Sequence, residues 1–278
     1  MKLGINFLLW TVHVDEQYYP LFDKLKSVGY DGVEIPLCFG ELDHYKKLGQ
    51  VIKDAGLEVT CTSNGSAEQN LISDDAAIRQ AGLDHIKWGV DRANALGGTV
   101  LGGPIHCAPA TFTGAGPSEL EFERAAEALK KAAAYGADAG VLIAPEILNR
   151  FECYLTNNVK QAKYLSELVD HSNYGIHYDT HHANIEESDI VAALKNGGKH
   201  IRHVHFSESH RGTLGTGQAN FIDTVKGLEA IGYDEWVTLE AFTTKVDGLK
   251  QAVHMWQEQE SDEALCYQKS LEFLKKFY

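Results

Sequence analysis

The chain of 278 residues carries 25 basic and 39 acidic residues, so its formal net charge is −14 with the histidines neutral. This excess of negative charge argues against nucleic acid or an anionic membrane as a partner, because both attract clustered Lys and Arg. Hydrophobic residues make up 44% and charged residues 23%, which is typical of a globular protein with one large core. The five cysteines are scattered and form no CxxC pair, which favours a reduced, cytoplasmic location over a disulfide framework or a thiolate zinc site.

Short apolar runs alternate along the chain with longer segments of helical period. The first run is too short to span a membrane and lacks a cleavage site, so we interpret it as a buried strand. In chain order, the predicted strands are 3–9, 32–35, 58–62, 99–102, 141–144, 175–178, 201–206 and 236–239. The predicted helices are 18–28, 42–55, 75–96, 119–139, 159–169, 190–195 and 221–230, with a last pair at about 248–257 and 262–277.

This alternation of strands and helices predicts the fold class. Eight strands, each followed by a helix, match a (β/α)8 TIM barrel of the α/β class in size and order. We expect one domain over residues 1–278, with a C-terminal helical extension at about 257–278. This extension could close the barrel or form a dimer contact, but we favour a plain amphipathic packing helix. A doubly wound open sheet is the alternative, but no GxGxxG turn follows the first strand.

Acidic residues and a histidine stand at or near the ends of the last four predicted strands. They are Glu146, Asp179, His205 and Glu240, separated by 33, 26 and 35 residues, which is one βα repeat each time. Active sites of TIM barrels are built at the carboxyl ends of the strands, so neighbouring strands would bring these side chains to one point. Three carboxylates and one imidazole suit Mn²⁺, Mg²⁺ or Co²⁺ better than structural zinc.

Each of these residues also has an ordinary structural explanation. An acid after a strand is usually a helix N-cap or a solvated loop residue, and a histidine in an apolar strand is usually a hydrogen-bonded core residue. Four such residues at matching positions of consecutive strands favour the metal site. His203 points to the same side of its strand as His205, because the two are two residues apart. We select His205 as the ligand because it lies nearer the carboxyl end.

Several motifs carry a resemblance to a known family. They are Pro-Glu-Ile-Leu-Asn-Arg-Phe-Glu at 145–152, Tyr-Asp-Thr-His-His-Ala-Asn-Ile-Glu-Glu at 178–187, His-Val-His-Phe-Ser-Glu at 203–208 and Leu-Glu-Ala-Phe at 239–242. With these motifs the chain resembles the ketose 3-epimerases (of D-tagatose, D-allulose and L-ribulose) among the xylose-isomerase-like TIM barrels. The resemblance extends over nearly the whole chain.

The resemblance implies that Glu146, Asp179, His205 and Glu240 bind Mn²⁺ or a similar ion, Co²⁺ or Mg²⁺ included. It also implies that Glu146 and Glu240 are the acid–base pair. In such a reaction one carboxylate removes the proton at C3 of a ketose, and the other returns a proton to the opposite face of the resulting cis-enediolate. The implied activity is the epimerisation of free ketoses at C3.

The same motifs imply substrate contacts. Glu152, His182 and Arg211 would bind substrate oxygens, and Trp10 and His106 would line the sugar pocket. His181 departs from the family pattern, which has an aromatic residue at this position. The glycine-rich loop 211–217 could bind phosphate, because loops near the seventh and eighth strands of barrels often do. We favour a tight loop that lets Arg211 reach inward, and therefore an unphosphorylated sugar.

Other functions on the same barrel remain open. An aldose–ketose isomerase of the hydroxypyruvate-isomerase type or a polyol dehydratase would use the same metal site. A DNA-repair endonuclease would need a basic surface and further zinc ligands, which the net charge of −14 opposes. A non-catalytic sugar-binding protein is the fourth alternative. The expected partners are a small ketose and further copies of the chain in a homodimer or homotetramer, with no nucleic acid and no membrane.

Overall fold

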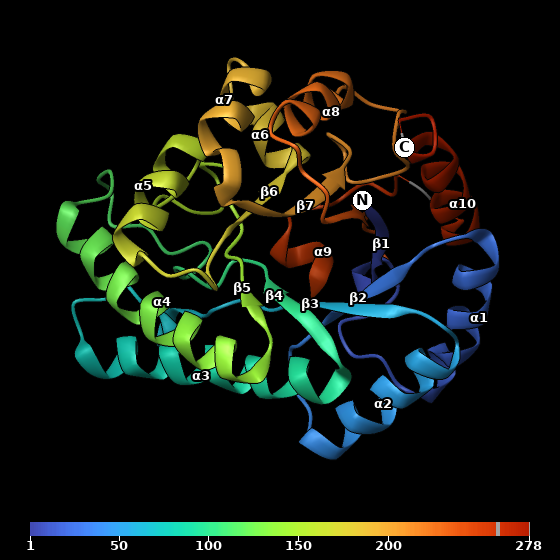
Figure 1. Cartoon of the computed structure of the whole chain (residues 1–278), viewed down its shortest axis with the longest axis horizontal. Coiled ribbons are helices and arrows are strands. Elements are labelled where there is room, and N and C mark those ends of the chain that lie inside the picture. The colour runs from blue at the N-terminus through green and yellow to red at the C-terminus, as the bar shows by residue number, and fades with distance from the viewer. Residues whose placement is uncertain (260–261, 278) are drawn as a thin grey trace.

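The computed structural model of the protein describes residues 1–259 and 262–277, and in this part of the chain eight parallel strands form one curled sheet (Figure 1). The strands are adjacent in the order β5-β4-β3-β2-β1-β8-β7-β6. Isolated parallel bridges join Ile143 to Tyr174 and Glu146 to His177, and they close the sheet between β5 and β6. The strands are β1 Lys2–Asn6, β2 Gly32–Pro36, β3 Glu58–Thr62, β4 Gly98–Gly102, β5 Leu142–Ile143, β6 Ile176–Asp179, β7 Ile201–Ser207 and β8 Trp236–Glu240.

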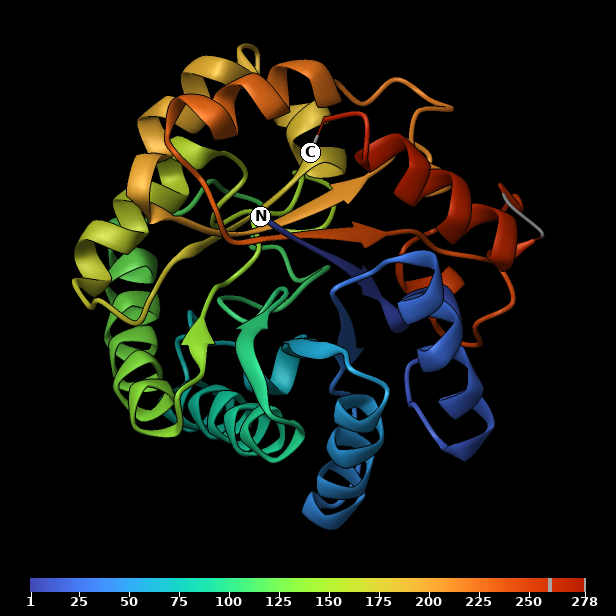
Figure 2. The same ribbon diagram turned by 45° about the vertical axis from the view of Figure 1, so that its right-hand side comes forward.

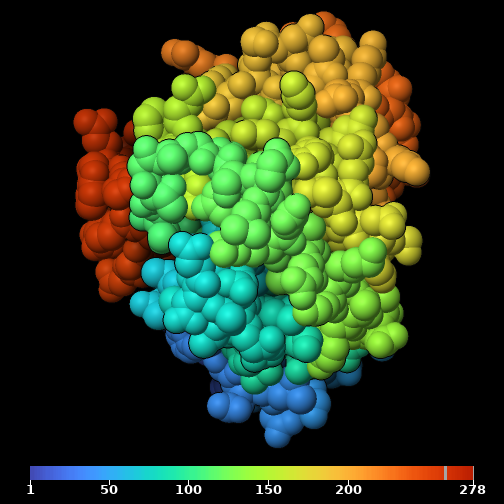
Figure 3. Space-filling view, turned by 90° about the vertical axis from the view of Figure 1, so that its left-hand side faces the viewer, coloured from blue at the N-terminus to red at the C-terminus, as the bar shows by residue number. Residues whose placement is uncertain are grey.

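Helices surround this sheet, and both ribbon views show them on its outer side, except for α9 near the middle of Figure 1 (Figures 1 and 2). In the face seen in Figure 3, the colours run from blue at the bottom through cyan, green and yellow to orange at the top, as expected of successive βα units, and the red C-terminal segment lies at the left edge. None of the helices described is long and apolar enough to cross a lipid bilayer. The helices are α1 Tyr19–Val28, α2 Leu42–Asp54, α3 Ala76–Leu96, α4 Glu119–Ala139, α5 Val159–Val169, α6 Thr180–Glu186, α7 Ile190–Gly197, α8 Phe221–Ala230, α9 Leu249–Ala252 and α10 Glu263–Leu274.

The strands are buried on both faces, which explains their continuous apolar runs. Every residue of β2 and of β8 is buried, because the helices cover the outside while side chains fill the inside. Glycine is required where the Trp236 ring packs against β2. A Cβ atom at Gly32 would lie 2.5 Å from that ring, so any side chain there would displace the tryptophan.

The predicted (β/α)8 barrel is confirmed. The differences are helix α6, Thr180–Glu186, which was not predicted, and the ends of several elements. The first strand ends at Asn6 rather than at residue 9, because the Asn6 side chain accepts a hydrogen bond from the Leu8 N–H (2.8 Å) and begins the 3-10 helix Phe7–Leu9. The helix predicted at 248–257 is only Leu249–Ala252, and His254 has a left-handed φ of 54°. Of the predicted extension 257–278, residues 260, 261 and 278 lie outside the described residues.

Close packing of α2 on α3 gives a stability prediction. A Cβ atom at Gly49 of α2 would lie 2.6 Å from the Leu96 carbonyl oxygen at the end of α3. We expect Gly49→Ala to lower the free energy of unfolding by about 1–2 kcal/mol, because overpacking outweighs the gain in helix propensity. Gly89→Ala is the matched control, since its Cβ would meet only the Leu101 side chain, at 3.0 Å. Urea unfolding in which Gly49→Ala is at least as stable as Gly89→Ala would contradict this account.

Candidate active site

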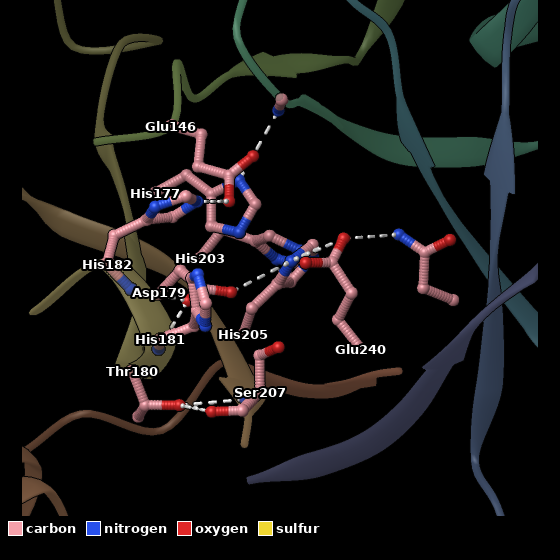
Figure 4. A network of polar contacts seen from close by, with 12 residues as sticks. Glu146, His177, Asp179, Thr180, His181, His182, His203, His205, Ser207 and Glu240 are labelled. Carbon is pink, nitrogen blue, oxygen red and sulfur yellow. Dashed lines mark hydrogen bonds and ion pairs between the residues drawn. The ribbon is translucent and has the colours of Figure 1, made fainter. Parts of the chain in front are cut away.

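The four residues predicted as metal ligands lie together at the carboxyl ends of the strands. Asp179 and Glu240 end β6 and β8, His205 lies near the end of β7, and Glu146 follows β5. Each offers one oxygen or nitrogen atom, and these four atoms all lie within 4.8 Å of one another. Figure 4 shows the four side chains converging on one region. The spacing of one βα repeat therefore predicted their proximity correctly.

The two carboxylate oxygens of Asp179 have different roles, because only one of them is hydrogen-bonded to the backbone. Its Oδ1 accepts hydrogen bonds from the backbone N–H groups of His181 (2.6 Å) and His182 (3.1 Å), which makes it the N-cap of α6. Its Oδ2 is buried and has no hydrogen-bond partner in the structure. A buried carboxylate oxygen without a partner is costly, so this atom points to a group that binds there.

His205 is oriented by a hydrogen bond to Glu34 on the side away from the other three residues of the cluster. Its Nε2 bonds the Oε1 atom of Glu34 over 2.6 Å. Its buried Nδ1 has no hydrogen-bond partner and lies 3.4 Å from Glu240 Oε1 and 3.8 Å from Asp179 Oδ2. Because a carboxylate that holds one imidazole nitrogen fixes the tautomer and leaves the other nitrogen free to ligate, Nδ1 is the atom available to a metal.

Glu34 is the residue of this site that the sequence analysis missed. It lies in β2, is fully buried, and accepts hydrogen bonds on both oxygens, from Asn6 Nδ2 (2.9 Å) and from Thr60 Oγ1 (3.0 Å) in addition to histidine. Its Oε2 also bonds His203 Nε2 over 2.7 Å, so Glu34 holds both histidines of β7. What distinguishes them is that His205, and not His203, groups with Glu146, Asp179 and Glu240. The signal was present in the sequence as a single acid inside the apolar run Gly-Val-Glu-Ile-Pro.

The acids of this cluster repel one another in a buried setting. Burial raises the pKa of Glu146 to about 8, and the charge of Glu240 adds to the rise. Burial also raises the pKa of Asp179 to about 6, although Arg211 opposes the shift. Burial opposes ionisation of Glu240 as well, but His205 and Arg211 hold its pKa below the ordinary value. Full ionisation of the three carboxylates is therefore disfavoured in this buried site, and a divalent cation, which would stabilise their charged forms, fits it.

Arg211 crosses from the loop after β7 into this cluster. Its Nη1 donates hydrogen bonds to Ser207 Oγ (2.9 Å) and Glu240 Oε2 (2.7 Å), and its guanidinium lies over the Phe242 ring at 4.9 Å. Its Nη2 lies 3.2 Å from His182 Nε2. The backbone of Arg211 is left-handed, with a φ of 64°, and this turn directs the side chain inward.

His182 and its neighbour His181 diverge, as adjacent residues of a helix must. His182 Nδ1 accepts a hydrogen bond from the Asn149 N–H over 3.1 Å, and its Nε2 lies 3.5 Å from Glu146 Oε1. His181 Nδ1 lies instead 3.3 Å from the Glu208 carbonyl oxygen. Burial and the charge of Arg211 lower the pKa of His181 to about 2, so this extra imidazole is neutral.

A cavity of about 340 Å³ lies above the four converging residues, a volume in the range of small-molecule sites. Its wall includes Glu146 and Glu240, and also the three residues predicted to bind substrate oxygens, which are Glu152, His182 and Arg211. Apolar residues complete the wall from several loops and from α9, among them Leu8, Val12, Pro104, Leu148, Phe242 and Leu249.

Trp10 and His106 are not among the residues that line this cavity, contrary to their predicted position. Trp10 packs against Phe7 and Tyr267, with ring centroids 4.9 and 6.0 Å away. His106 is buried, and its Nε2 lies 2.8 Å from Thr156 Oγ1. The pocket walls near them are formed by Leu8, Val12, Pro104 and Pro109, so a position in the motif did not predict the direction of the side chain.

The Glu208 carboxylate fixes the glycine-rich loop 211–217 and its flanks through hydrogen bonds from backbone N–H groups. The buried Glu208 carboxylate accepts hydrogen bonds from the N–H groups of Ser209 (2.7 Å), Gly215 (3.0 Å) and Ala219 (2.9 Å). Phosphate-binding loops present such N–H groups to the ligand. Here a carboxylate uses them, which supports the tight-loop interpretation of this segment.

Comparisons with known proteins identify the family of the chain. Residues 22–277 match the family described as Xylose isomerase-like TIM barrel. The ketose 3-epimerase of Arthrobacter globiformis is 34% identical over 253 residues, which are 88% of this chain and 85% of that protein. The D-psicose 3-epimerase of Ruminiclostridium cellulolyticum is 29% identical, over 93% of this chain and 89% of that protein. The structure of the D-allulose 3-epimerase from Methylomonas sp. in complex with D-allulose superposes with a TM-score of 0.94 at 28% identity, covering 100% of this chain and 97% of that one. The chain therefore belongs to the xylose isomerase-like TIM-barrel family and, within it, to the ketose 3-epimerases, which are isomerases.

Proposed function

We propose that this enzyme epimerises free ketoses at C3 with a divalent metal and two glutamates, Glu146 and Glu240. The observation that carries the proposal is the convergence of Glu146, Asp179, His205 and Glu240 beneath a cavity of about 340 Å³. Only Glu146 and Glu240 of the four also line the cavity. They are therefore the acids of this set that a bound sugar can reach.

The metal would be held by these four residues. The donor set is rich in oxygen, and two of its buried atoms, Asp179 Oδ2 and His205 Nδ1, have no hydrogen-bond partner. Such a set suits Mn²⁺, with Co²⁺ or Mg²⁺ as alternatives. When bound, the ion would act as a Lewis acid that stabilises negative charge on the substrate oxygens.

The two glutamates would exchange the C3 proton. Glu146 follows β5 and Glu240 ends β8, so they approach a bound sugar from different sides of the barrel. One carboxylate would remove the C3 proton to give a cis-enediolate, and the other would protonate the opposite face with inversion. Proton transfer by a positioned carboxylate contributes about 10²- to 10⁴-fold to such a rate.

Glu152, His182 and Arg211 would hold substrate oxygens, since all three line the cavity. The Arg211 guanidinium and the Glu152 carboxylate are complementary as donor and acceptor for sugar hydroxyls. An unphosphorylated sugar is favoured because Glu208 occupies the loop amides that a phosphate would need. A single domain over the whole chain, the cytoplasmic location and a homodimer or homotetramer stay predictions.

Solvent deuterium distinguishes this reaction from its alternatives. With a free ketohexose and Mn²⁺ in D₂O, we expect the epimeric product to carry deuterium at C3, because the returned proton comes from an acid that exchanges with solvent. Proton and carbon NMR of the sugar measure the position of the label. Label at C1 alone would instead identify an aldose–ketose isomerase, and loss of water would identify a dehydratase.

Replacing either glutamate should slow turnover strongly while the fold remains. We expect Glu146→Gln and Glu240→Gln each to lower kcat by about 10²- to 10⁴-fold, because an amide cannot transfer the proton. Glu235→Gln is the matched control, since Glu235 pairs with Arg202 and precedes β8 at the opposite end of the strand. A Glu240→Gln enzyme that keeps wild-type kcat would exclude Glu240 as a proton carrier.

Metal removal tests the donor set by two independent measurements. After dialysis against EDTA, we expect activity to fall to background and the melting temperature to drop. Adding Mn²⁺ at 100 times its dissociation constant should restore both, because such binding stabilises the native state by about 2.7 kcal/mol. A melting temperature that does not respond to Mn²⁺, Co²⁺ or Mg²⁺ would argue against a metal at this cluster.

Glu34 should control metal affinity without touching the metal. We expect Glu34→Gln to weaken Mn²⁺ binding about 10- to 100-fold, because His205 loses the charged partner that orients it. Isothermal titration of the metal-free protein with Mn²⁺ measures the change. Glu58→Gln, at the exposed start of β3, is the control and should bind as wild type. Equal affinities in the two variants would show that Glu34 serves only the fold.

A further inference from the structure

Two thiols meet outside the candidate active site. Cys107 Sγ and Cys153 Sγ are 2.8 Å apart, although the residues are 46 positions apart in the sequence, and both side chains are buried. His106 Nε2 lies 3.7 Å from Cys153 Sγ, and the Leu155 N–H donates a hydrogen bond to the same sulfur over 3.3 Å. These residues form a compact sulfur–imidazole cluster.

The cluster joins two loops that border the cavity. Cys107 lies between β4 and α4, and Cys153 lies between β5 and α5. The cavity wall includes Pro109, two residues after Cys107, and Glu152, the residue directly before Cys153. The backbone already links the loops, since the Ala110 N–H donates to the Glu152 carbonyl oxygen over 2.8 Å.

The surroundings make the two sulfurs unequal. The hydrogen bond from Cys107 lowers the pKa of the Cys153 thiol well below its ordinary value, and His106 adds to the effect against the opposing effect of burial. The same sulfur–sulfur contact and burial raise the pKa of Cys107 well above its ordinary value. A cysteine of lowered pKa beside one of raised pKa is the pairing of an attacking and a resolving cysteine.

A metal site is a poorer fit to this geometry. Two thiolates that bind one tetrahedral zinc at about 2.3 Å each lie roughly 3.7 Å apart. The separation of 2.8 Å is shorter than that and closer to the S–S bond length of about 2.05 Å. A movement of under about 1 Å therefore converts the contact into a bond.

We propose that Cys107 and Cys153 form a redox-active dithiol that a peroxide closes to a disulfide, which links the β4–α4 and β5–α5 loops beside the cavity. The Cys153 thiolate attacks one oxygen of hydrogen peroxide, which gives a sulfenic acid at Cys153 and releases hydroxide. The Cys107 thiol then attacks the Cys153 sulfur, and the hydroxyl group leaves as water with the Cys107 proton. Two electrons pass from the two sulfurs to the peroxide, and a dithiol reductant reverses the reaction.

The test counts thiols in the full chain. Cys38 is the exposed cysteine, so Cys38→Ser is used as the parent to remove its reaction with peroxide. After treatment with hydrogen peroxide, we expect two of the remaining thiols to disappear and the intact mass to fall by about 2 Da, with a linked 107–153 peptide after digestion. Dithiothreitol should restore both thiols. The crosslinked protein should melt roughly 4–10 °C higher than the reduced protein.

Matched variants distinguish disulfide formation between Cys107 and Cys153 from oxidation of the other thiols. Cys107→Ser and Cys153→Ser should each prevent the loss of mass, whereas Cys61→Ala, which removes another buried thiol, should leave it unchanged. His106→Gln tests the positioning of the thiolate, and we expect oxidation about tenfold slower at neutral pH with a rate that recovers as pH rises. Retention of all thiols in the parent, or oxygen added to Cys153 without a linked peptide, would overturn the proposal, and neither result depends on epimerase activity.

Discussion

Two hydrogen bonds from buried histidines to the Glu34 carboxylate determine how the candidate active site is built. They run from His203 Nε2 (2.7 Å) and His205 Nε2 (2.6 Å) and connect β2 to β7 across the inside of the barrel. An isolated buried carboxylate would be very unfavourable, and these bonds, with those from Asn6 and Thr60, satisfy it. Because Nε2 of His205 is used in this way, only its Nδ1 can face the other three acids. The placement of the candidate metal thus depends on a residue that does not touch it.

Glu146 and Glu240, which both line the cavity, differ in the charges around them. Glu240 receives a hydrogen bond from Arg211 and lies beside His205, whereas Glu146 has the neutral His182 as its near neighbour. The carboxylates on the two sides of the cavity therefore differ in their surroundings, and the pKa of Glu146 is raised while that of Glu240 is lowered. A site with two acids in unequal environments is the usual arrangement for moving a proton between them.

The barrel and the convergence of its four strand-end residues could be predicted from the sequence, because both follow from local patterns along the chain. Repeating strands and helices predict the barrel, and the carboxyl ends of parallel strands bring Glu146, Asp179, His205 and Glu240 to the same end of it. Contacts that depend on direction or on loop shape could not be predicted. His106 follows a turn that aims its ring at Thr156, and Cys107 meets Cys153 only because two irregular loops touch. Glu34 could have been found, since an acid within a fully buried strand requires a partner.

Asp179 shows how the fold and the chemistry restrict a single position. One oxygen begins helix α6, and the other, which has no hydrogen-bond partner, faces the cluster of acids. Serine, threonine and asparagine can begin a helix equally well but bring no negative charge, while glutamate brings the charge but is a weaker N-cap. Aspartate alone meets both requirements. Fewer residue types are therefore tolerated at position 179 than either folding or catalysis would allow by itself.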